Sequence, residues 1–209
     1  MRLLAFDETC TLMERLRRLA RSALRRVDDL YRLLHGLQAV GPVLFVGRRR
    51  YHGPARRFAD GTQLNPGDVL GTLHFNNARI AALDAATPNA IAVRFIRLLM
   101  ESMRSLAELA HEDGPFGDLA VFQGIGWWEH GKPFGFIGEP FPESGRKRFL
   151  AVHIGLLVWA FAPPASTAIA ARPEPRISWI TRDTLIKRYG RAERPGREVL
   201  DTAPGARSG

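Results

Sequence analysis

The chain has 209 residues, 45% of them hydrophobic and 24% charged, which is enough for one substantial core and typical of a globular protein. Its formal net charge is +9 and 27 of its 30 basic residues are arginine, an excess that either biased codon usage or attraction to an anionic surface explains. The single cysteine, Cys10, excludes an internal disulfide and a zinc site built on several thiolates.

The N-terminal segment is predicted to form a long helix from about Leu12 to His35. Thr11 and Glu14 fit a capping box at its start, and Gly36 is a typical helix terminator. Apolar residues recur at steps of three and four and form one stripe: Leu12, Leu16, Leu19, Ala23, Val27, Leu30 and Leu34. Arginines follow the same spacing on another face: Arg15, Arg18, Arg25 and Arg32. Two interpretations stay open, a helix that packs on the core with a solvated arginine face and a helix that lies on anionic lipid or a partner.

The sequence contains no segment that marks export or a membrane span. The N-terminus lacks the apolar core and cleavage site of a signal peptide, and no apolar run reaches about 20 residues. The longest run, Phe149 to Ala162, is interrupted by His153 and has the length of a buried core helix. We therefore expect a cytoplasmic protein, with peripheral attachment to the inner membrane as a variant of that location.

A short strand from Val43 to Val46 is followed by three consecutive arginines, Arg48, Arg49 and Arg50. These side chains are candidate binding residues for an anionic partner, either anionic lipid or an envelope saccharide. Nucleic acid is disfavoured, because the sequence has no RNP-type aromatic motif, zinc-finger spacing or helix-turn-helix pattern. No feature identifies a protein partner.

Residues 57–80 combine turn signals with a cluster of polar side chains. The dipeptides Asp60-Gly61 and Pro66-Gly67 are typical of turns, and apolar residues between Val69 and Phe75 predict a strand. His74, Asn76 and Asn77 follow where this strand gives way to a helix from about Ala78 to Ala85. Polar groups at the end of a strand that face a helix N-terminus often take part in ligand chemistry.

The rest of the chain predicts further helices and strands in a mixed order. We expect a helix from Pro88 to about His111 capped by Thr87, a strand pair at Leu119–Ile125 and Phe134–Ile137 joined by a turn around Glu129–Lys132, a helix at about Arg146–Phe161, a strand at Ile177–Ile180, and a short helix from Thr181 to Tyr189. This order predicts an α+β fold over residues 1–190, a single domain with a small, mainly antiparallel sheet packed with three main helices. Residues 191–209 are rich in Arg, Pro and Gly and are predicted to form a disordered tail.

His74 and Glu101 are the candidate catalytic residues. His74 could act as a general base or bind an anion, and the alternative is a histidine held by a main-chain carbonyl. Glu101 interrupts an apolar stretch and would then need a partner such as His74, whereas a solvent-facing glutamate needs none. Asp60, Asn76 and Asn77 are candidate binding residues, the two asparagines also being candidate helix caps. We expect no cofactor and no metal, because no two of the six histidines lie three or four residues apart.

Several short motifs resemble those of the YkoP-like domain family: Asp60-Gly61-Thr62, Pro66-Gly67-Asp68, Leu73-His74-Phe75-Asn76-Asn77, Glu101-Ser102-Met103, Gly124-Ile125, His130-Gly131, Gly135-Phe136 and Leu185 to Tyr189. The resemblance covers roughly Val27 to Gly190. Members of this family occur alone or attached to polysaccharide deacetylases, so the resemblance implies a fold and a cellular context more than a chemistry.

Two functions are therefore carried forward. The first is a non-catalytic accessory protein associated with the cell envelope or another anionic surface. The second is a small hydrolase or transferase that uses His74 and Glu101. A purely structural interaction protein is the third option.

Overall fold

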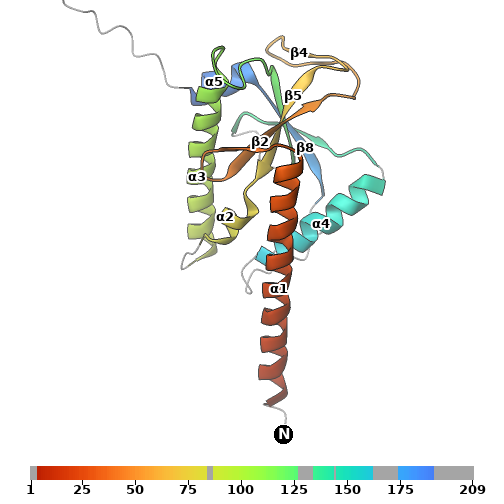
Figure 1. Cartoon of the computed structure of the whole chain (residues 1–209), viewed down its shortest axis with the longest axis vertical. Helices are drawn as coiled ribbons and strands as arrows, with labels where there is room; N and C mark the ends of the chain where they lie inside the picture. The colour runs from red at the N-terminus through yellow and green to blue at the C-terminus, as the bar shows by residue number, and fades with distance from the viewer. Residues whose placement is uncertain (1–3, 84–86, 127–133, 144, 162–173, 191–209) are drawn as a thin grey trace, which may run out of the picture.

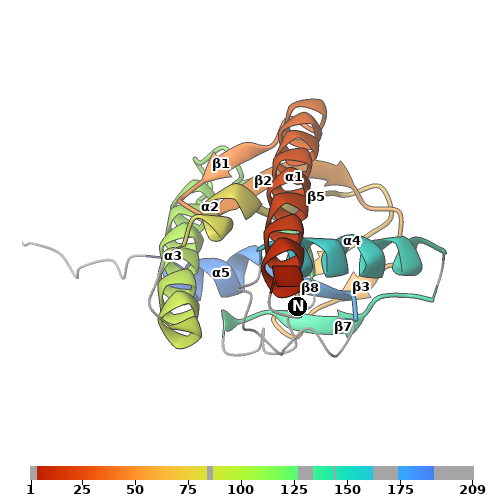
Figure 2. The ribbon, with the colours of Figure 1, turned by 90° about the horizontal axis from the view of Figure 1, so that it is seen from below.

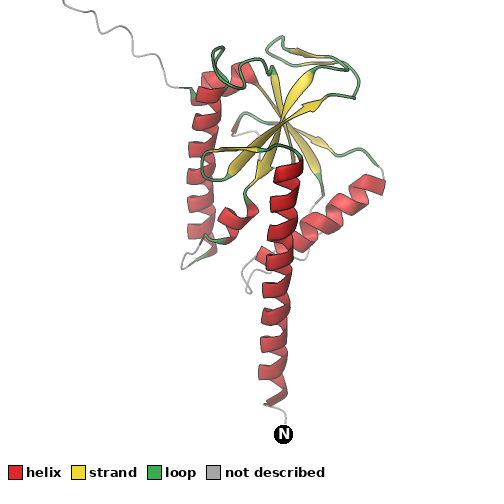
Figure 3. Ribbon diagram, viewed as in Figure 1, coloured by secondary structure: helices red, strands yellow, loops and turns green. Residues whose placement is uncertain are grey.

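The computed structural model describes residues 4–83, 87–126, 134–143, 145–161 and 174–190. These residues form five helices, a six-stranded sheet and a two-stranded hairpin (Figures 1 and 3). In chain order the elements are α1 (Leu4–Leu34), β1 (Gln38–Val40), β2 (Leu44–Arg50), β3 (Arg56–Arg57), β4 (Gln63–Leu64), β5 (Val69–Phe75), α2 (Asn77–Ala81), α3 (Pro88–Leu109), β6 (Val121–Gly126), β7 (Ile137–Pro140), α4 (Gly145–Phe161), β8 (Arg176–Thr181) and α5 (Arg182–Tyr189).

The strand order of the main sheet is β1-β2-β5-β6-β8-β7. Four of its five strand pairs are antiparallel, and the fifth, β5 with β6, is parallel because α2 and α3 lie in the connection between them. The predicted α+β class with a mainly antiparallel sheet is confirmed. The predicted pairing of the strands now labelled β6 and β7 is wrong, because β8 lies between them and pairs with both.

One face of the sheet carries the larger core. Neighbours in register share a face, so Val46, Leu73 and Phe122 point to the same side. On that side they pack against α3 and α5, mainly through Leu99, Met103, Leu106, Leu185 and Tyr189. This helical layer anchors the sheet whose opposite face builds the site.

The opposite face is covered in two parts. The hairpin β3–β4 and its flanking loops cover one part, where Leu70, Val121 and Trp179 form a second core with Tyr51, Phe58 and Leu64. Arg56 closes this core, since its guanidinium lies 4.6 Å from the Trp179 ring centroid and makes two 2.6 Å hydrogen bonds to Glu139. The helices α1 and α4 cover the other part, next to each other (Figure 2).

The turn and cap signals are largely confirmed. Gly61 and Gly67 have φ values of 89° and 97°, which glycine tolerates without strain. The side chains of Asn76, Thr87 and Thr181 each accept a hydrogen bond from a main-chain N–H at the start of a helix. The capping box predicted at the start of the first helix is wrong, because α1 begins at Leu4 and places Thr11 inside it.

The helix α4 does not mainly form core, contrary to the prediction for Phe149–Ala162. Ile154 is buried, but Phe149 is 70% and Val152 71% exposed. Three and four residue steps put Phe149, Val152 and Leu156 on one outward stripe. The predicted turn at Glu129–Lys132 and the predicted tail at 191–209 lie outside the described residues.

Candidate functional site

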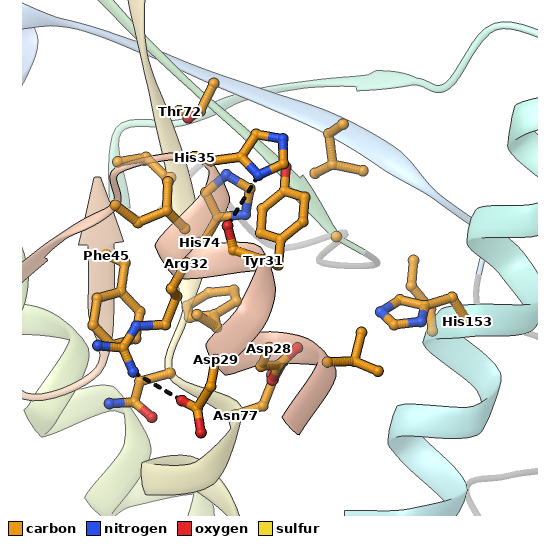
Figure 4. A pocket seen from close by; sticks show the side chains of 18 of the residues that line it. Asp28, Asp29, Tyr31, Arg32, His35, Phe45, Thr72, His74, Asn77 and His153 are labelled. Carbon is orange, nitrogen blue, oxygen red and sulfur yellow. Dashed lines mark hydrogen bonds and ion pairs between the residues drawn. The ribbon is translucent and has the colours of Figure 1, made fainter. Parts of the chain in front are cut away.

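A groove of about 540 Å³ lies between the sheet, α1 and α4 (Figure 4). We refer to it as the α1–α4 groove. Strands β5 and β6 form its floor, α1 and α4 form its walls, and Asn77 at the start of α2 closes one corner. Its volume falls within the range of natural small-molecule sites.

The floor of the groove is polar. Thr72 and Gln123 are direct neighbours in the β5–β6 register, and His74 lies two residues further along β5 on the same face. Within the described part of the chain, the side chains of Thr72, His74 and Gln123 make no hydrogen bond to protein atoms. All three side chains are partly exposed in the groove, so they are available to water or a ligand.

His74 lies mostly buried beneath an aromatic pair on α1. The Tyr31 ring stacks on His35 with centroids 3.9 Å apart and lies 5.2 Å from the His74 ring. Burial, helped by the nearby charge of His35, lowers the pKa of His74 to about 4. His74 is therefore a neutral imidazole near pH 7, which can both donate and accept a hydrogen bond.

Asp28 is the acidic group of the α1 wall. Its Oδ2 accepts a 2.8 Å hydrogen bond from Nδ2 of Asn77, and His153 of α4 lies across the groove (Figure 4). Burial raises the pKa of Asp28, while Asn77 and the charge of His153 oppose the increase. The arrangement holds a carboxylate oriented by one amide, opposite an imidazole with no hydrogen bond to the described residues.

Part of the predicted site is brought together here. His74, Asn76, Asn77, Arg48 and Arg49 all line the groove. Asn76 acts as the cap of α2, and Asn77 orients Asp28. The Arg48 guanidinium is held by Asp118 at 2.6 and 2.8 Å, so it is not a free anion ligand. Arg50 is exposed and does not line the groove.

Glu101 and Asp60 lie elsewhere, and the predicted pairing of His74 with Glu101 is not what the structure shows. Glu101 is exposed on α3, the helix on the opposite face of the sheet. Its neighbour Ser102 is the buried one and accepts a hydrogen bond from the main-chain N–H of Val43. Asp60 lies in the β3–β4 turn, where it accepts hydrogen bonds from the Thr181 hydroxyl and the Thr62 N–H. The hydrolase or transferase interpretation thus loses its carboxylate.

Other residues of the groove were missed by the sequence interpretation. The candidate residues predicted from the sequence do not include Asp28, Tyr31, His35 or Gln123, which line the groove. A signal existed for His153, because it is the one polar residue inside the apolar run of α4. No sequence signal marked Gln123, since its role depends on which strand lies beside β5.

The exposed surface of α1 is a second candidate site. Leu12, Leu16 and Leu19 are 57%, 45% and 68% exposed, and the stripe continues through Val27, Leu30 and Leu34. The body of the protein instead meets the helix face that carries Leu24, Asp28 and Tyr31, about a third of a turn away. The N-terminal half of α1 extends beyond the rest of the molecule (Figure 1). The interpretation of the leucine stripe as core-packing is therefore wrong.

Neither a metal centre nor a membrane span is found in the parts described. Among these residues no three His, Cys, Asp or Glu side chains are grouped so that they could hold a metal ion. No described helix combines the length and the apolar character needed to cross a bilayer.

Comparisons with known proteins identify one relationship. A family model for the YkoP domain matches residues 17–189. Comparison with curated proteins and with solved structures gave no significant match.

Proposed function

The chain belongs to the YkoP domain family, and we propose that it is a non-catalytic accessory protein that attaches to an anionic membrane surface through α1. The observation that carries this proposal is the uncovered leucine stripe of α1 beside a dense group of arginines. Attachment of this kind is peripheral, with the helix lying in the plane of the membrane surface.

The stripe is costly to leave in water. Burying one leucine side chain gains about 1.5–3 kcal/mol, and α1 presents several of them along one line. Proteins rarely expose a continuous apolar stripe unless it meets a partner or a membrane.

The charge of α1 favours anionic lipid as the partner. Between Leu12 and Val27 the sequence has six arginines and one acidic residue, Glu14. On a helix of about 100° per residue, Arg15 and Arg26 border the stripe on the side that faces away from the body. A second copy of the chain would bring the same positive charges together, whereas an anionic surface gains about 1 kcal/mol for each arginine near it.

The apolar stripe of α4 adds to the proposal. Phe149, Val152 and Leu156 are exposed on the helix that flanks α1 on the same side of the sheet. These side chains can add apolar contacts with a membrane next to those of α1.

A liposome sedimentation assay with the full chain tests the proposal. Vesicles of phosphatidylcholine alone are compared with vesicles that also contain phosphatidylglycerol, at low and high salt. We expect binding that requires the anionic lipid and weakens with salt. Equal binding to both vesicle types, or none to either at low salt, would overturn it.

Two matched pairs of variants locate the attachment site. Leu16→Gln with Leu19→Gln should abolish binding, whereas Val93→Gln with Ile96→Gln on α3, also exposed, should not. Arg15→Gln with Arg26→Gln should weaken binding about 30-fold, at about 1 kcal/mol per arginine, whereas Arg97→Gln with Arg104→Gln should not. A dimer that the leucine variants dissociate, without lipid binding, would point to a second copy as the partner and reject the proposal.

A further inference from the structure

The part of the sheet face that forms the floor of the α1–α4 groove is unexpectedly polar. Under the hairpin β3–β4, the same face of the same strands is apolar, with Leu70 on β5 and Val121 on β6. Two residues further along each strand the side chains become Thr72 and Gln123, followed by His74 on β5. A sheet face covered by helices is normally apolar, so packing against α1 and α4 does not explain the polar side chains of the floor.

The hydrogen-bonding capacity of this floor is not used within the described part of the protein. Thr72, His74 and Gln123 have no partner there, and neither has His153 in the α4 wall. Asp28 uses one oxygen to accept from Asn77 and has capacity for a further donor on the other. Among the described residues, these side chains are only partly buried, and none of their polar atoms is a fully buried atom without a hydrogen-bond partner. They therefore face the open groove, where a ligand can displace water and use them.

The kind of groups present restricts the ligand. A hydroxyl, a primary amide and a neutral imidazole each donate and accept, and a ligand hydroxyl does both as well. Asp29 and Arg32 form an ion pair with each other at 3.2 Å, so neither presents a free charge. An anionic ligand would still meet Asp28 in the α1 wall, and a cationic ligand would meet Arg25 and Arg49 around the same groove. The rings of Tyr31 and Phe149, which stack on His35 and His153, line the groove beside the polar floor.

We propose that the α1–α4 groove binds an uncharged, hydroxyl-rich ring, the chemistry of a sugar unit or a cyclic polyol. Thr72, Gln123 and His74 bond its hydroxyls from the floor, and Asp28 accepts from a further hydroxyl. The rim of this groove shares Val27 and Phe149 with the apolar stripes of α1 and α4, but its polar floor lies on the sheet side of α1 and does not depend on lipid attachment.

Titration of the full chain, followed by NMR of the histidine ring signals and by calorimetry, tests the site. The probes are D-glucose, N-acetyl-D-glucosamine, myo-inositol and the chitin trisaccharide, with glucose 6-phosphate and glucosamine as charged comparators. We expect saturable binding of at least one neutral probe, with shifts of the His74 and His153 signals, and at least tenfold weaker binding of the charged comparators. Tighter binding of the trisaccharide than of the monomer would assign the ligand to a polysaccharide, and the reverse to a free sugar. Preference for a charged comparator, or no saturable binding of any neutral probe, would overturn the proposal.

Variants of matched shape separate a ligand role from a structural one. Gln123→Leu and His74→Phe should each reduce binding at least tenfold while the melting temperature stays equal or rises, because an unpartnered polar group has been removed. Gln63→Leu and His52→Phe replace exposed residues outside the groove and should leave binding unchanged. If Gln123→Leu or His74→Phe unfolded the protein, or if Thr72→Val left binding unchanged, the floor would be structural and the proposal would fail.

Discussion

Replacing His74 with phenylalanine should make the protein more resistant to acid. In the folded protein burial holds the pKa of His74 at about 4, whereas in the unfolded chain it returns to its ordinary value of 6.5. As the pH falls, the unfolded chain therefore takes up the proton first, and protonation favours unfolding. Above about pH 6.5 both states are neutral at this position and the histidine has no effect.

The magnitude follows from the two pKa values. At 1.36 kcal/mol per pKa unit, protonation of His74 lowers the free energy of unfolding by about 3 kcal/mol in full, below pH 4. Between pH 7 and pH 5 the decrease is about 2 kcal/mol. Phenylalanine keeps a ring in contact with Tyr31 but cannot bind the proton. Between pH 7 and pH 5, the free energy of unfolding of the variant should therefore fall by about 2 kcal/mol less than that of the unmodified protein.

Urea denaturation at pH 7, 6 and 5 measures the difference directly. Asp28 is present in both proteins, whereas the repulsion between His35 and protonated His74 exists only in the unmodified protein and is part of the difference that is measured. His52→Phe, which removes an exposed histidine, is the control and should lose as much stability between pH 7 and pH 5 as the unmodified protein. Parallel loss of stability in His74→Phe and the unmodified protein would show that His74 is not held neutral by burial.

Three further substitutions test the packing and the polar contacts, each by urea denaturation at pH 7. Gly71→Ala should cost about 1–3 kcal/mol, because its Cβ would lie 2.2 Å from Cδ1 of the fully buried Phe122, while Gly126→Ala, with nothing within 4 Å, should be tolerated. Equal effects of the two would contradict the close contact. Thr181→Val should cost about 1–2 kcal/mol, because the hydroxyl caps α5 and donates to Asp60; unchanged stability would mean that the cap contributes nothing. Asp118→Asn should cost less than about 1 kcal/mol, because its ion pair with Arg48 is exposed to solvent, and a loss of several kcal/mol would refute that assignment.

Local signals in the sequence identified most elements but not how they face one another. Helix α3 begins after the predicted cap Thr87, and α5 ends at Tyr189, as predicted. These features depend on neighbouring residues only. The order of β6, β8 and β7 depends on pairs of residues 36 to 60 positions apart, and no local pattern specifies it.

The candidate site shows the same division. Periodicity along α1 correctly grouped the leucines on one face, but it cannot say which face meets the sheet. The body takes the face with Asp28 and Tyr31 and leaves the leucines outside. On α3 the adjacent residues Glu101 and Ser102 differ in the direction they face: Ser102 is buried in the core and Glu101 is exposed. His74 was found because a polar residue within a strand is visible without tertiary information.

The two edge strands of the six-stranded sheet limit how copies of this protein can associate. The outermost strands, β1 and β7, have only three and four residues, and β7 ends in Pro140, which has no N–H to offer a further strand. Such short edge strands are poor templates for the addition of a strand from a neighbouring molecule. Crowding or concentration should therefore drive contacts between helices rather than growth of a continuous intermolecular sheet.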